Sequence, residues 1–152
     1  MLSNSYLLEK VLSQSTSEVM LFFDNVDLVD FPYYLRGVVN IIGIDIVLKL
    51  SLVTSRIYIG KKGLDRFKLS NNFESRVILS SLHPSIKKEL IKVFGGEKIE
   101  LPTVDSIKKN TLFRVYKKKC LELHQNGEPV QDILRKIPLS KNKIVMIIEG
   151  RK

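Results

Sequence analysis

The segment 94–148 constrains the fold more than any other part of the chain. It contains Gly95-Gly96, a short run of β-favouring residues ending at Pro102, and then a long lysine-rich helical pattern. Asn126-Gly127 is typical of a turn that stops such a helix, and two short helical patterns follow it. A short strand, a basic helix and a compact helix-turn-helix indicate a DNA-binding protein rather than an enzyme.

The last two helical patterns carry the signals of a helix-turn-helix. Pro129 suits the first turn of one helix, and Ser140 is a predicted N-cap for the final helix. In that final helix the isoleucines between Ile144 and Ile148 should face inward, because they recur at helical spacing. The side chains left for the outward face are Lys141, Asn142, Lys143 and Met146.

Positive charge is concentrated in the second half of the chain. The formal net charge of the whole chain is +9. Residues 1–76 contain 9 basic and 8 acidic side chains, whereas residues 77–152 contain 16 basic and 8 acidic ones. Such asymmetry is expected when one end of a protein meets a polyanion. A lysine-rich surface that serves only solubility would give the same excess, so charge alone leaves both interpretations open.

Composition and motifs argue against several other classes of protein. The apolar stretches are too short or too interrupted for a membrane span, and the N-terminus lacks the basic segment of a secretory signal. A single cysteine, Cys120, fits a reducing cytoplasm. Cys120 shares a helical face with His124, but two more metal ligands at useful spacing are missing. The sequence also lacks a phosphate-loop motif and a nucleophile-elbow motif. The sequence predicts a cytoplasmic protein that is not an enzyme and needs no cofactor or metal.

A weak internal repeat precedes the basic helix. Shifting residues 48–60 by 42 positions aligns apolar with apolar residues, Ile57 with Ile99 among them. Segments 33–60 and 82–102 should therefore share a helix-turn-strand shape, although chance similarity remains the alternative. Short strands need a partner for their backbone groups, so the two should pair antiparallel, within one chain or across the favoured dimer. The strand candidates are Arg56, Ile57, Tyr58, Ile59, Lys98, Ile99, Glu100 and Leu101.

The order of these elements resembles the Mor/C family of phage middle- and late-operon transcription activators. Phe94–Pro102 looks like the family's link between its dimerisation and DNA-binding halves, and Ile42–Leu50 with Arg56–Ile59 is similar to its dimerisation segment. The chain is thus predicted to be mainly α with short β-strands. A helical dimerisation region would cover residues 1–102, and a helix-turn-helix DNA-binding domain would cover residues 103–152.

The resemblance also implies partners. Family members are homodimers with a strand paired across the two-fold axis, and they bind duplex DNA and contact RNA polymerase. This chain departs from the pattern in two places. The dimerisation segment occurs twice, which would allow an internal pseudo-dimer, and Pro138 stands in the interhelical turn where a glycine is usual. The second departure bears on the angle between the last two helices.

The predicted mechanism is insertion of the final helix into the major groove. Asparagine can bond adenine, and lysine can bond guanine. The base-edge candidates are Lys141, Asn142, Lys143 and Met146. Contacts with phosphates position a protein without specifying sequence. The phosphate candidates are Lys108, Lys109, Arg114, Lys117, Lys118, Lys119 and Ser140.

The favoured function is a sequence-specific transcriptional regulator, an activator by the family resemblance. The alternative is a protein-interaction module derived from such a regulator that no longer binds DNA, and both the duplication and Pro138 favour it. RNA binding is opposed by the lack of an RNP-type aromatic strand or a GXXG loop. For the last helix, the plain alternative is a core-packing helix with solvated lysines.

Overall fold

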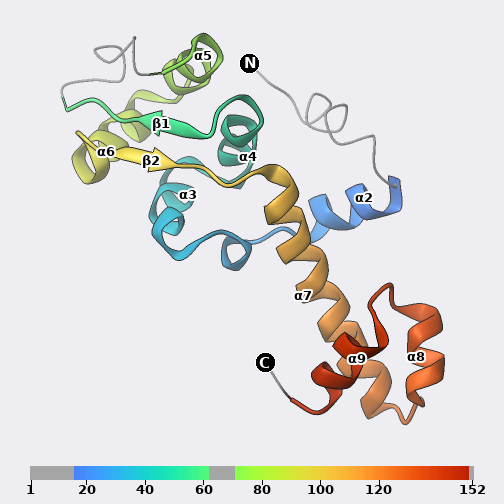
Figure 1. The fold of residues 1–152 in the computed structure, drawn as a ribbon. Coiled ribbons are helices and arrows are strands. Elements are labelled where there is room, and N and C mark those ends of the chain that lie inside the picture. The colour runs from blue at the N-terminus through green and yellow to red at the C-terminus, as the bar shows by residue number, and fades with distance from the viewer. Residues whose placement is uncertain (1–15, 62–70, 151–152) are drawn as a thin grey trace. The chain divides into compact units, whose positions relative to one another are not determined.

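The computed structural model describes residues 16–61 and 71–150, and residues 1–15 of the predicted N-terminal region lie outside them. The fold is mainly α with one two-stranded sheet, which confirms the predicted fold class (Figure 1). No helix in these residues is long and apolar enough to cross a membrane. The elements are α2 (Thr16–Asn25), η1 (Leu28–Asp30), η2 (Tyr33–Leu35), α3 (Arg36–Ile42), α4 (Ile44–Val53), β1 (Arg56–Tyr58), α5 (Phe73–Ser80), α6 (Pro84–Phe94), β2 (Lys98–Glu100), α7 (Val104–Gln125), α8 (Val130–Lys136) and α9 (Lys141–Ile148).

The chain divides into two compact units, Met1–Lys108 and Lys109–Lys152. The boundary lies inside α7, so one continuous helix contributes to both units. Each unit has its own apolar core. The core of the first unit is built from α2 to α6 with both strands, and the core of the second is built from the later part of α7 with α8 and α9.

The sheet of the first unit pairs the two predicted strands. β1 and β2 run antiparallel with Ile57 opposite Ile99, and both isoleucines are buried. The predicted antiparallel pairing is confirmed, but it lies within one chain rather than in the favoured arrangement across a dimer. The intervening helices α5 and α6 bring the second strand back beside the first, so no second copy is needed to complete the pair (Figure 1).

The first unit consists of two similar halves, α3–α4–β1 and α5–α6–β2. The 42-residue shift that relates the two sequences is also the shift that relates Ile57 to its strand partner Ile99. A pseudo-two-fold axis therefore passes through this pair. The helices obey the same symmetry, since α3 packs on α6 and α4 packs on α5. Each half thus places its first helix on the second helix of the other half.

The similarity reaches further along the chain than the sequence predicted. The helix-turn-strand shape is shared as expected, but the second half begins at α5, before the predicted start at residue 82. The first helices align with a shift of 40 residues, and the two extra residues of the second half lie between α5 and α6. The aligned pairs include Tyr33 with Phe73, Arg36 with Arg76 and Val38 with Ile78. In both halves the arginine lies over the aromatic ring three residues before it, at 5.6 Å in the first half and 5.9 Å in the second.

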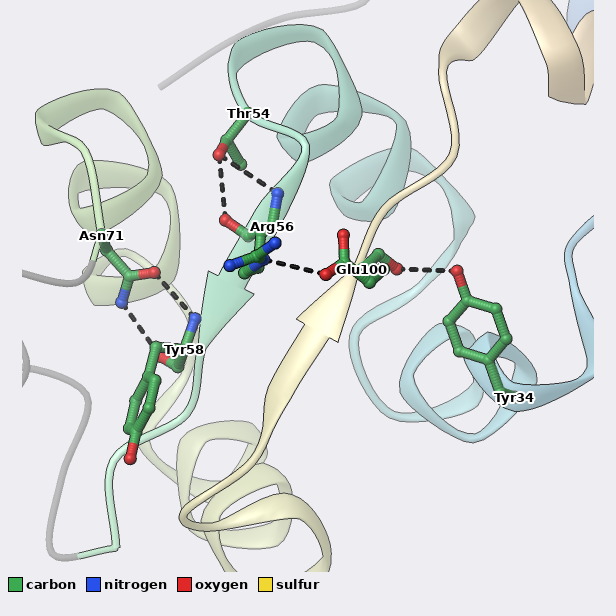
Figure 2. Close-up of polar contacts among 6 residues, drawn as sticks. All are labelled: Tyr34, Thr54, Arg56, Tyr58, Asn71 and Glu100. Atoms are coloured by element: carbon green, nitrogen blue, oxygen red, sulfur yellow. Dashed lines mark hydrogen bonds and ion pairs between the residues drawn. The ribbon is translucent and has the colours of Figure 1, made fainter.

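The outer edge of β1 is covered by polar side chains of the same chain (Figure 2). The Asn71 amide accepts from the backbone N–H of Tyr58 at 2.8 Å and donates to its carbonyl at 2.9 Å. The Thr54 hydroxyl likewise accepts from the backbone N–H of Arg56 at 3.3 Å and donates to its carbonyl at 2.9 Å. These side chains occupy the outward-facing backbone groups that a third strand would need.

The outer edge of β2 is covered in a related way (Figure 2). The Tyr34 hydroxyl donates to the backbone carbonyl of Glu100 at 3.0 Å. Burial and then the Glu100 charge raise the pKa of Tyr34 above its usual value, so the hydroxyl keeps its proton at neutral pH.

Arg56 and Glu100, which face each other across the strands, form an ion pair at 2.9 Å. Both are largely exposed, so this ion pair adds little stability.

Replacing Asn71 with Ala should destabilise the chain by about 2–4 kcal/mol, because it leaves two partly buried backbone groups of Tyr58 without partners. Denaturant unfolding followed by circular dichroism measures the change. Asn40→Ala is the matched control, since Asn40 is exposed on α3, and it should stay within about 0.5 kcal/mol of the parent. Equal stabilities for the two variants would contradict the role given to Asn71.

Candidate nucleic-acid interface

Within the second unit, a glycine turn ends α7. Gly127 has a φ of 85°, and its N–H donates to the carbonyl of His124 at 3.0 Å. The N–H of Glu128 donates to the carbonyl of Leu123 at 3.1 Å. Together these bonds satisfy the last carbonyls of α7, as the Asn-Gly pair predicted. Pro129 is the N-cap of α8, one residue before the first helical turn in which the sequence placed it.

A four-residue turn, 137–140, separates α8 from α9. The N–H of Leu139 donates to the carbonyl of Ile137 at 2.8 Å, which closes a tight three-residue turn with Pro138 at its centre. The fixed φ of proline suits the centre of such a turn. Ile137 is buried, Leu139 is half-buried and Pro138 is exposed. Pro138 therefore forms the turn without preventing α8 from packing on α9.

The core of the second unit is made of the side chains that the periodicity placed inside. Ile144 and Ile147 of α9 are buried and Ile148 is half-buried. They pack with Ile133 of α8, with Ile137 of the turn and with Cys120 of α7. Burial raises the pKa of the Cys120 thiol, so it stays neutral and packs as an apolar group. His124 is exposed, and within 16–61 and 71–150 no three potential metal ligands lie close together.

The outward face of α9 is formed by side chains of its first two turns. Lys141, Asn142 and Met146 are exposed. Residues four apart lie one above the other on a helix, so Asn142 and Met146 form the centre of this face. Val145 is half-buried beside them. Val145 was not among the predicted residues of this face, although its position out of phase with the buried isoleucines was a usable signal.

Lys143 behaves differently from the other three base-edge candidates. Its ammonium lies 5.9 Å from the centre of the Phe113 ring on α7. Phe113 is 41% exposed, so part of its ring is open to solvent. Between the two lies a shallow groove of about 420 Å³. It is lined by Lys109, Asn110, Leu112, Phe113, Tyr116, Leu139 and Lys143.

The phosphate candidates on α7 do not form one surface. Lys108 is 5% exposed and its ammonium lies 3.9 Å from a Glu18 carboxylate oxygen in the first unit. Burial therefore keeps it from DNA, and its prediction as a phosphate contact is wrong. Lys117, Lys118 and Lys119 are exposed, but consecutive helical residues point about 100° apart. They cannot all face one duplex.

The remaining phosphate candidates fall into three positions. Lys109 lines the groove beside Phe113, and Lys117 follows Phe113 by one turn on the same side of α7. Arg114 is half-buried. The Ser140 hydroxyl accepts from the backbone N–H of Lys143 at 3.3 Å, which confirms it as the N-cap of α9.

Charge in the second unit is balanced on α8 but not at the start of α9. Lys136 pairs with Glu128, and Arg135 lies 4.0 Å from Asp132. In contrast, no carboxylate of the described residues forms an ion pair with Lys141 or Lys143. The helix dipole adds partial positive charge at the same end of α9. This end of the helix is therefore the more attractive to an anion.

No protein-family model, curated protein or solved structure matches the chain. The chemistry of α9 and its surroundings is therefore the basis on which function is assigned. It comprises an N-capped helix with exposed hydrogen-bonding side chains, an excess of positive charge and an adjoining apolar groove.

Replacing Ser140 with Ala should lower the stability of the second unit by about 0.5–2 kcal/mol, because an N–H in the first turn of α9 loses its partner. Ser140→Asp is the matched control, since an aspartate can cap the helix and should preserve stability. Thermal unfolding followed by circular dichroism compares the two. An alanine variant as stable as the aspartate variant would show that the cap contributes nothing.

Proposed function

We propose that the chain is a sequence-specific DNA-binding transcriptional regulator of the Mor/C type, with α9 as the helix that enters the major groove. The observation that supports this most is the composition of the exposed face of α9. Hydrogen-bonding and apolar side chains share that face, and the lysines of its first turn have no acidic partner among the described residues. A helix kept only for core packing has no need of this pattern.

Each side chain on this face suits a different base feature. The Asn142 amide can bond an adenine through two hydrogen bonds, and Lys141 can donate to a guanine. Met146 and Val145 offer apolar contacts to a thymine methyl group. Lys117 and Lys109 on α7 would contact phosphates and fix the position of the second unit without reading sequence.

The internal strand pair changes what the family resemblance implies for assembly. The two segments that resemble the family's dimerisation segment are paired inside one chain, whereas the described residues hold one helix-turn-helix. Each chain would therefore bring one DNA-reading unit to a half-site. A second copy on the next half-site, about 34 Å away, would supply the other. The resemblance adds activation and contact with RNA polymerase to the proposal, and the single cysteine adds a cytoplasmic location.

A protein-interaction module that no longer binds DNA is the second candidate. The covered edges of the sheet favour this candidate. The two strands pair with each other in one chain, so the sheet does not join two DNA-reading units across a dimer. The two candidates differ in one property that is simple to measure. Only the regulator needs affinity for duplex DNA.

The chain should bind duplex DNA with a strong dependence on salt. If its second unit contacts about four or five phosphates, affinity should fall by about 10²–10³ between about 50 and 200 mM salt, because binding releases condensed counterions. Fluorescence anisotropy of a labelled duplex measures this. No binding at the lower salt concentration would reject the regulator and favour the interaction module.

Asn142→Ala should lower specificity rather than general affinity, by about 1–3 kcal/mol on the preferred site, because a bidentate base contact is lost. The preferred site is first selected from a random duplex library, and the variant is then compared on selected and random DNA. Asn40→Ala, a change of the same type on exposed α3, is the control and should leave both affinities unchanged. Equal losses on the two DNAs would mean that Asn142 contacts no base.

A further inference from the structure

The groove beside α9 combines an apolar floor with a basic rim. Phe113, Leu112 and Leu139 contribute apolar surface, and Lys109 and Lys143 contribute the ammonium groups. None of its lining residues is acidic. The groove contains Lys143 from the first turn of α9, so it adjoins the face that the proposed function assigns to DNA. Phe113 is the one phenylalanine in the sequence of the second unit.

We propose that this groove binds the sugar–phosphate backbone of a DNA duplex next to the major groove that α9 enters. The deoxyribose rests on the ring of Phe113, and Lys109 and Lys143 contact the two phosphates that flank it. This inference rests on the proposed function, because it names a second contact made by the same unit. The ligand class follows from charge complementarity, since a chain of alternating apolar sugars and anionic phosphates matches an apolar floor between two cations.

The groove gives Lys143 a different role from that of Asn142. A lysine held over an aromatic ring by a cation–π contact is restrained in direction, and this ring lies on α7 rather than along the outward face of α9. Lys143 therefore contacts the backbone and contributes to affinity on every sequence. Asn142, one residue earlier, faces the base edges.

A tryptophan probe can test the contact directly, because the chain has no tryptophan of its own. Phe113→Trp puts a single fluorophore in the groove, and Phe73→Trp puts one at an exposed phenylalanine of the first unit as a control. Adding a duplex should shield the fluorophore at position 113 from acrylamide quenching and leave the one at position 73 unchanged. An unshielded fluorophore at position 113, in a variant that binds duplex by anisotropy, would overturn the groove while leaving the proposed function intact.

Affinity measurements on truncated side chains complete the test. Phe113→Ala should weaken duplex binding about tenfold, since it removes apolar contact area, with no change in the salt dependence. Lys143→Ala should weaken binding on selected and random DNA alike and reduce the salt slope by about one. The matched controls, Phe73→Ala and Lys88→Ala in the first unit, should change neither quantity.

Three other results would count against the proposal. A loss for Lys143→Ala confined to selected DNA would return Lys143 to the base-reading face. A Phe113→Ala variant that loses single-stranded binding but keeps duplex binding would make the groove a base-stacking site. A parent protein that binds no duplex at all would reject the proposed function together with the groove, so the two failures can be told apart.

Discussion

The pairing of Ile57 with Ile99 is the contact on which the first unit depends. It fixes the antiparallel register of β1 and β2, and a shift by one residue would turn both buried isoleucines to the opposite face. With that register set, the two halves are related by a pseudo-two-fold axis. Each half then covers the apolar surface of the other, because α3 packs on α6 and α4 packs on α5. Neither half could bury its core alone.

Side chains within the chain also limit the extent of the sheet. Asn71 and Thr54 occupy outward-facing backbone groups of β1, and Tyr34 occupies one of β2. A pair of three-residue strands normally depends on further strands or on packing for its stability. Here the helices supply the packing and these side chains supply the hydrogen bonds. One chain thus contains a strand pair that is complete without a second copy.

In the second unit, the buried isoleucines of its own core hold α9 on α8. They also determine which side chains of α9 face outward. Ser140 caps the helix, and the turn around Pro138 joins it to α8. Pro138 is accommodated because the turn there has a negative φ, which the proline ring requires. The outcome is a helix whose first turn is positive and whose far side is apolar.

Local rules in the sequence determined the helices of residues 103–148, the glycine turn, the Ser140 cap and the buried isoleucines of α9, because spacing and caps act over a few residues. The 42-residue repeat was also visible in the sequence, but α5 was not predicted. The burial of Lys108, the location of the strand pair within one chain and the direction of Lys143 were decided by the tertiary structure. All three depend on neighbours distant in sequence: Glu18, the opposite half and Phe113. Periodicity shows which side of a helix is apolar, but only the folded chain shows which residues that side meets.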